Sequence, residues 1–207
     1  MNHSAALEQF FDRFRHAWQS THGQLPVTDR DEAGPAAVSE HELGQHWQAV
    51  PQQPLGAFSN LEPALELPVH PDLQAFYGHF YGGNLQFDAD FGCGELLQPW
   101  NQDDFAFLQE NLVGHALMKK RLKQPATWFV GVMEQSDAMV VMDNADGSLW
   151  LEVPGQEPHQ KLADNLSELL GQIAPRVMMP EPAPLPPPRP GFWARLKAML
   201  GDLTGRR

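Results

Sequence analysis

Cysteine is almost absent from this chain of 207 residues, in which Cys93 is the only one. One thiol excludes an intramolecular disulfide and a cysteine-based metal cluster. Such cysteine usage is typical of a cytosolic protein. Cys93 stands between Gly92 and Gly94, and we interpret it as an isolated thiol in a turn.

Long apolar runs are also missing. No stretch of 18 apolar residues occurs, so the sequence predicts no membrane-spanning helix. The first residues lack a basic region followed by an apolar run, and we expect no signal peptide. Gly-x-Ser-x-Gly, P-loop and dinucleotide motifs are absent as well. We therefore expect a cytoplasmic protein that is not an enzyme and needs no cofactor.

Basic side chains are scarce and unevenly placed, and the net charge is -12. Residues 1–100 contain three basic and thirteen acidic side chains, whereas residues 180–207 contain five basic and two acidic ones. An acidic body repels phosphates, which argues against nucleic acid as a partner and favours a basic one. Simple solubility is the alternative explanation of the charge.

Two apparent metal motifs fail on spacing. His41, Glu42 and His46 place one residue too many between the histidines for a zinc protease helix. Residues 143–147 resemble the start of a calcium loop but lack its later ligands, so we interpret them as a hairpin turn. We expect no metal site.

Hydrophobic periodicity outlines the secondary structure. Helices are predicted over residues 4–21, 72–81, 101–124 and 159–172, and strands over 85–87, 95–98, 127–133, 138–142 and 148–153. Residues 27–60 are polar and rich in glycine and proline, so we expect loops there with one short strand near 46–50. Pro63 and Pro68 argue against a helix between them.

This order predicts an α+β fold, in which a small, mostly antiparallel sheet packs against three to four helices. We expect a domain over residues 1–175 and a proline-rich linker over 176–190. A basic amphipathic helix is expected over 191–207, after the linker.

The predicted helix after Asn101 contains the most distinctive residues. Asn101 is a favourable N-cap, and Asp103 and Asp104 fall in the first turn, where the helix dipole favours carboxylates. His115 falls on the apolar face, so we expect it to pack in the core rather than bind a ligand.

Residues 100–105 (WNQDDF), 109–115 (QENLVGH) and 120–125 (KRLKQP) closely resemble the central helix block of the Syd family. Residues 14–25, 70–80 and 162–170 resemble its flanking helices, so the resemblance covers about residues 5–175. It implies an α+β fold shared with cell-wall regulators and toxin-immunity proteins. It also implies binding to the cytoplasmic face of the SecY translocation channel, as a regulator or quality-control factor on the inner membrane.

The resemblance further implies a concave acidic surface that receives basic loops of the channel. The charge count agrees, because cytoplasmic loops of membrane proteins are rich in Lys and Arg. We predict that the following carboxylates form this surface: Glu62, Glu66, Asp88, Asp90, Asp103, Asp104 and Glu110. Asp103 and Asp104 also have a simpler explanation as helix-stabilising charges. A solvated strand end is the alternative for Asp88 and Asp90, and a plain surface charge for Glu110.

The C-terminal segment lies outside the resemblance. Its apolar stripe and flanking cations suit a helix lying on an anionic membrane, and the predicted contact residues are Phe192, Trp193, Arg195, Leu196, Lys197 and Leu200. Three alternatives remain open: the tail docks in the acidic groove, binds SecY directly, or forms little structure. For the whole protein, the alternative function is an immunity module that neutralises a basic toxin.

Overall fold

The computed structural model describes residues 3–59 and 61–180. Its helices are α1 (His3–His22), α2 (Leu61–Leu65), α3 (Pro71–Tyr77), α4 (Gln102–Leu122) and α5 (Leu166–Gln172). Its strands are β1 (Val27–Thr28), β2 (Ala37–His41), β3 (Gly44–Trp47), β4 (Val50–Pro51), β5 (Phe80–Tyr81), β6 (Leu85–Ala89), β7 (Gly92–Leu96), β8 (Thr127–Met133), β9 (Met139–Asp143), β10 (Leu149–Glu152), β11 (Gln160–Ala163) and β12 (Ala174–Pro175). Helices and antiparallel strands occur together, which confirms the predicted α+β class.

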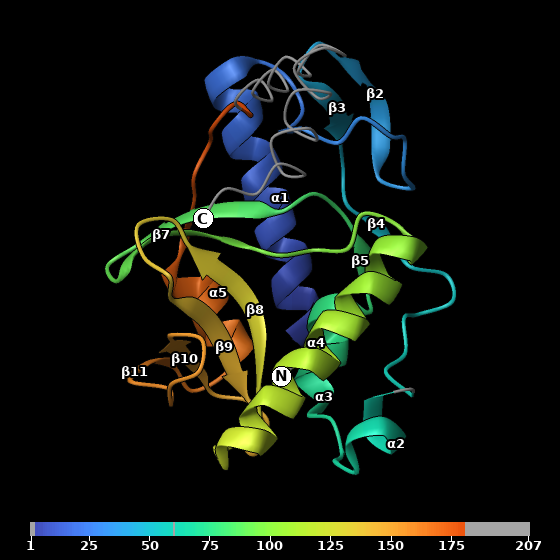
Figure 1. Ribbon diagram of the computed structural model, residues 1–207. Helices are drawn as coiled ribbons and strands as arrows, with labels where there is room; N and C mark the ends of the chain where they lie inside the picture. Colours follow the sequence, from blue (N-terminus) through green and yellow to red (C-terminus); the bar gives the residue numbers. More distant parts are fainter. Residues whose placement is uncertain (1–2, 60, 181–207) are drawn as a thin grey trace, which may run out of the picture.

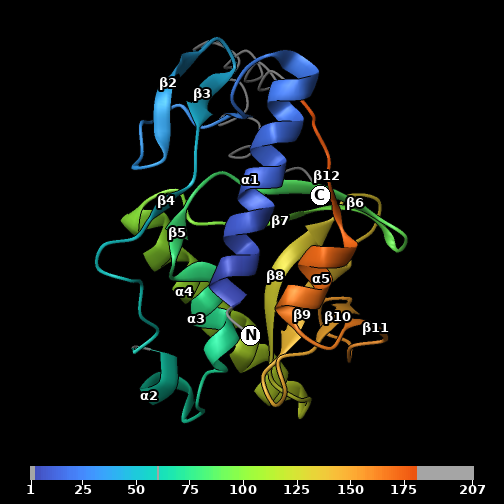
Figure 2. The same ribbon diagram turned by 180° about the vertical axis from the view of Figure 1, so that it is seen from behind.

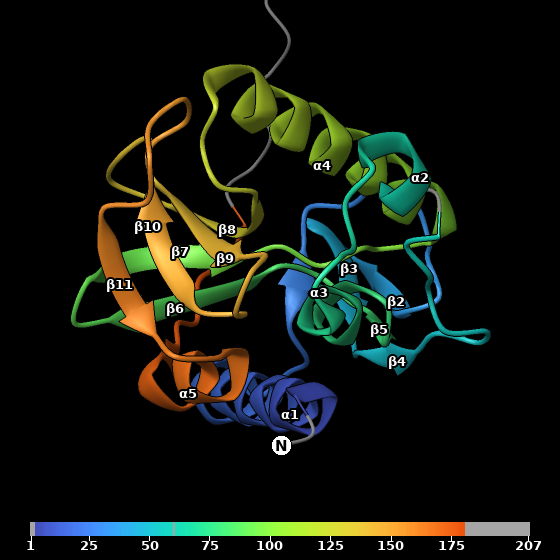
Figure 3. The same cartoon turned by 90° about the horizontal axis from the view of Figure 1, so that it is seen from below.

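A seven-stranded antiparallel sheet organises the fold, in the order β11-β10-β9-β8-β7-β6-β12. The sheet is curled, with α1 and α5 on one side and α4 on the other (Figures 1 and 3). Leu85, Phe87 and Leu96 are fully buried. Between them in the strands, Gln86 and Glu95 are register partners and point to the opposite side, because side chains alternate along a strand.

The first helix forms where its apolar residues predict it. Leu7, Phe10, Phe14 and Trp18 repeat at three- and four-residue intervals and are almost completely buried. Figure 2 shows α1 running along the back of the molecule beside α5. Arg13 donates a hydrogen bond to the Leu170 carbonyl, which joins the first and last helices of the described chain.

Residues 27–59 contain more structure than the single short strand that we expected. β1, β3 and β2 form a small sheet, and β4 pairs with β5. The pattern is hard to recognise because the residues of β2 are partly or fully exposed and show no alternation. Gly44 is required here: its φ is +134°, and a Cβ would lie 2.1 Å from the Thr28 carbonyl oxygen.

The two short helices differ from the prediction. α2 forms despite Pro63, because proline in a first turn loses no intrahelical hydrogen bond. α3 begins as expected but ends at Tyr77 rather than Tyr81, because the chain then pairs as β5 with β4.

The remaining elements mostly follow the prediction. The Asn101 side chain caps α4 by accepting a hydrogen bond from the Asp104 N–H (2.8 Å), and Lys123 ends the helix with a left-handed backbone. Cys93 lies in β7 rather than in a turn. The helix expected over 159–172 is wrong in its first half, where 160–163 pair with β10 and α5 starts only after the N-cap Asn165.

Candidate functional site

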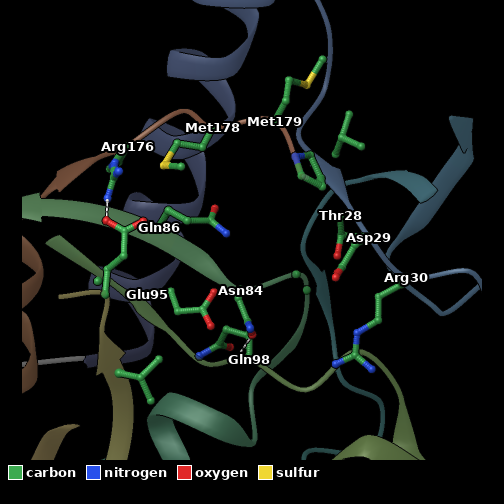
Figure 4. Close-up of a pocket in the computed structure, with 17 residues that line it drawn as sticks. Thr28, Asp29, Arg30, Asn84, Gln86, Glu95, Gln98, Arg176, Met178 and Met179 are labelled. Carbon is green, nitrogen blue, oxygen red and sulfur yellow. Dashed lines mark hydrogen bonds and ion pairs between the residues drawn. The ribbon is translucent and has the colours of Figure 1, made fainter. Parts of the chain in front are cut away.

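A groove of about 580 Å³ lies between the β1 segment and the α4-facing side of β6 and β7. Gln86 and Glu95 from the sheet form its floor together with Asn84 and Gln98 (Figure 4). Asp29 and its neighbours line one wall. Residues 176–180, which follow the sheet's edge strand β12, line another. Segments distant in the sequence therefore meet around one concave surface.

Glu95 is the central carboxylate of the groove. Burial raises its pKa above the ordinary value, a hydrogen bond from Asn84 lowers it, and the nearby charges of Asp29 and Glu134 raise it further. Asn84 is oriented by a second contact, since its side-chain oxygen accepts the Gln98 N–H at 3.0 Å. The three carboxylates thus influence one another. Because Glu134 is already paired with Arg176, an added cation would mainly relieve the repulsion between Glu95 and Asp29.

Gln98 adds an acceptor that lacks a partner among the described residues. Its side chain is 4% exposed, its Nε2 donates to the Phe76 carbonyl at 3.3 Å, and its Oε1 receives no hydrogen bond there. Buried acceptors are normally satisfied. The Oε1 atom is itself buried, so it is an unsatisfied acceptor beneath the floor of the groove rather than a contact open to a ligand.

Both arginines of the groove already have carboxylate partners. Arg30 pairs with Asp104 at 2.9 Å, and Arg176 pairs with Glu134 and with Asp88 at 3.7 Å. The two guanidinium charges are offset by these partners. The carboxylates of Asp29 and Glu95 have no ion-pair partner among the described residues.

Hydrogen bonds to the start of α4 position the groove wall that Asp29 and its neighbours form. The Trp100 indole donates to the Glu32 carbonyl at 3.1 Å, and Trp100 N–H donates to Asp104 at 3.0 Å. Asp104 therefore holds both its own helix terminus and Arg30. Its predicted helix-stabilising role is compatible with a place beside the groove.

The predicted acidic residues are dispersed. Asp88 and Asp104 reach the groove through the arginines that they bind. Asp90 is exposed in the turn between β6 and β7, and Asp103 and Glu110 are exposed on α4. Glu62 and Glu66 belong to the α2 region at the far end of the molecule (Figure 1). The structure does not bring these seven together.

Three groove carboxylates, Asp29, Glu95 and Glu134, were missed in the sequence. Glu95 stands next to Leu96 in a strand, and alternation places it opposite the buried face, which is a usable signal. Nothing local marks Asp29 or Glu134, because only the fold brings them to Glu95. The predicted tail residues, from Phe192 to Leu200, lie outside the described residues.

A second polar cluster fastens α4 to the sheet. Lys119 and Glu152 are both fully buried and form an ion pair of 2.9 Å, and Glu152 also accepts a hydrogen bond from Thr127. His115 bonds Thr127 at 3.0 Å, and burial lowers its pKa. These groups are enclosed rather than open to a ligand, as expected for His115 in the core.

The described residues contain no cluster of three or more His, Cys, Asp or Glu side chains that could hold a metal ion. Within the same ranges, no helix is long and apolar enough to cross a membrane. Residues 143–147 form the expected hairpin turn, closed by a hydrogen bond from Gly147 N–H to the Asp143 carbonyl (3.0 Å).

The structure is that of an α+β protein with a curled antiparallel sheet and a groove lined by three carboxylates and two arginines. Residues 4–175 match the family model described as "Syd protein (SUKH-2)". The chain belongs to the Syd family.

Curated relatives named "Protein Syd" support this membership. The one from Shewanella loihica is 43% identical, with the whole of both chains covered. Those from Shewanella amazonensis and Shewanella baltica are 46% and 42% identical, with 98% of each chain covered. The first alignment includes residues 181–207, which lie beyond the family model.

Proposed function

We propose that this protein binds the basic cytoplasmic loops of the SecY channel in the groove around Glu95. It acts there as a regulator or quality-control factor of translocase assembly, by binding rather than by catalysis. The Syd membership supports the choice of SecY. The cluster of Asp29, Glu95 and Glu134 is the observation that supports a basic ligand.

The groove offers a basic side chain both charge and hydrogen bonds. A guanidinium at Glu95 meets a carboxylate already oriented by a hydrogen bond from Asn84, and it can form two parallel N–H···O bonds with that carboxylate. Because Arg30 and Arg176 are paired within the protein, they repel an incoming cation less than free arginines would. Charge complementarity of this kind speeds association and rejects acidic partners.

The tail contributes the second contact of this proposal. Its cations and aromatic residues favour an anionic membrane beside the channel, which places the protein on the cytoplasmic side of the inner membrane. Met178, Met179 and Pro180 line the groove, so the tail begins beside the bound loop. Membrane contact there raises the effective concentration of the groove near SecY.

Binding to SecY in nanodiscs at two salt concentrations tests the main proposal. We expect affinity to fall about tenfold from 50 to 300 mM salt, since screening weakens exposed charges. Combining Asp29→Asn with Glu95→Gln should abolish detectable binding, whereas the exposed loop variant Glu157→Gln should bind normally. Absence of wild-type binding at both salts would reject SecY and favour the immunity-module alternative.

A further inference from the structure

The last described residues, 178–180, belong to the lining of the groove. After β12, the Arg176 N–H donates to the Gln86 carbonyl at 3.0 Å, so the chain continues along the groove. Met178, Met179 and Pro180 then form part of its lining, and Figure 4 shows both methionines above Gln86. Residues 181–207 therefore start at the rim of an anionic cavity.

An apolar notch of about 160 Å³ continues the groove toward α4. The two cavities share Arg30, Asn84 and Gln98. Phe107, Leu108 and Phe129 are among the residues that line the notch. Phe107 is 61% exposed, so its ring offers apolar surface at the edge of the notch. The combined surface fits a basic segment that carries a bulky apolar side chain.

The chain itself contains such a segment. Residues 181–207 hold five basic and two acidic side chains, against a strongly acidic remainder. Phe192 and Trp193 stand between Arg189 and Arg195, so an aromatic pair is flanked by cationic groups. An arginine can approach Glu95 while a neighbouring aromatic ring fills the notch.

The connection is long enough. Twelve residues lead from Pro180 to Phe192, and an extended proline-rich chain covers about 3.1 Å per residue. The reach is on the order of 35 Å, which exceeds the roughly 30 Å diameter of a small domain. Short tethers give effective concentrations of about 1 mM. A contact with a dissociation constant near 100 μM would therefore make the docked form about tenfold more populated than the undocked form.

We propose that the C-terminal segment around Arg189–Lys197 docks in this groove, with Phe192 or Trp193 in the notch lined by Phe107. The segment thereby competes with any basic ligand of the site. If the ligand is a SecY loop, as the proposed function holds, its binding expels the segment and frees it for the membrane beside the channel. Docking itself does not depend on the identity of that ligand.

The test uses full-length proteins and a fluorescent peptide of residues 186–203 as the probe, without SecY or membrane. The wild type should bind the peptide weakly, because its own tail occupies the site. The double variant Phe192→Ser, Trp193→Ser should bind the peptide about tenfold more tightly. Circular dichroism shows whether each variant is folded.

Adding Phe107→Ser to the double variant should weaken peptide binding about tenfold. Leu117→Ser is the matched control, since Leu117 is also exposed on α4 but does not line the notch. Equal binding by the wild type and the double variant would overturn the proposal, and so would equal effects of Phe107→Ser and Leu117→Ser. In a separate assay, a peptide that binds vesicles of phosphatidylglycerol but not the double variant would also overturn the proposal and identify the tail as a membrane anchor alone. Because the peptide assay contains no SecY, its outcome does not depend on whether the protein binds SecY.

Discussion

At the scale of single residues, the stability of the domain depends on a few enclosed polar groups. Lys119 is buried beneath α4 and satisfied by Glu152 and by the Gln156 carbonyl at 3.0 Å. Both ions lost their hydration on folding, and each is stable only because the other is present. The cluster joins α4 to β8 and β10.

Replacing Lys119 by Met should lower the free energy of unfolding by about 3–5 kcal/mol, because an unpaired carboxylate remains buried. The double variant Lys119→Met, Glu152→Gln keeps an acceptor for Thr127. It should regain at least half of the unfolding free energy that the single variant loses. Urea denaturation measures both. A loss below about 1 kcal/mol for the single variant would contradict a buried ion pair.

The pH dependence of stability should report His115. Its pKa is lowered by burial, so the unfolded chain takes up the proton more readily than the folded one. The contribution of His115 is complete above pH about 6.5 and is lost as the pH falls toward its folded pKa. His115→Gln should flatten the stability profile between pH 7 and 5, whereas the exposed His16→Gln should not. Thermal denaturation across this range provides the comparison.

At the scale of elements, side-chain hydrogen bonds attach a loop to the sheet where no strand pairing does so. Asn144 lies in the hairpin turn after β9 and accepts hydrogen bonds from His70 N–H (2.9 Å) and the Trp128 indole (2.7 Å). It donates to the Pro68 carbonyl at 2.9 Å. One amide thereby holds the connection between α2 and α3 against the sheet.

Asn144→Ala should destabilise the protein by about 2 kcal/mol, since three partners lose their hydrogen bonds. For a chain of this size the melting temperature should drop by about 4–8 °C. Asn144→Asp keeps the acceptors and loses only the donor, so its effect should be clearly smaller. Equal melting temperatures for the two variants would show that the acceptor contacts contribute little.

At the scale of the whole molecule, the carboxylate at the centre of the proposed binding groove lowers the stability of the fold. Glu95 has a raised pKa, so the folded state holds this proton more tightly than the unfolded chain. Its contribution to stability is largest below pH about 4.5 and decreases as the pH rises through the folded pKa. The same ionisation completes the anionic site, so ligand binding and stability respond in opposite directions.

Glu95→Gln should therefore raise the free energy of unfolding at pH 7 by about 0.5–1 kcal/mol. It should also weaken binding of the 186–203 peptide to the variant with a mutated tail. In that background, peptide affinity should decrease from pH 7 to 5 when Glu95 is present and change less when it is not. Fluorescence anisotropy gives the affinities; a destabilised Glu95→Gln protein would show that the carboxylate is structural.

The sequence alone determined the features that depend on neighbouring residues. The apolar stripe of α1, the Asn101 cap of α4 and the hairpin over 143–147 follow from local spacing and turn chemistry. The excess of acidic residues is likewise independent of the fold. These signals sufficed for the α+β class and for a family resemblance over about residues 5–175.

Only the tertiary structure decided which carboxylates share a site. Asp29, Glu95 and Glu134 come from three distant segments, whose meeting depends on the sheet register and on the wall held by Trp100. The β2–β3 hairpin and β11 also form through strand pairing that outweighs weak local preference. Charge can be counted along a chain, but a groove exists only where folding brings those charges together.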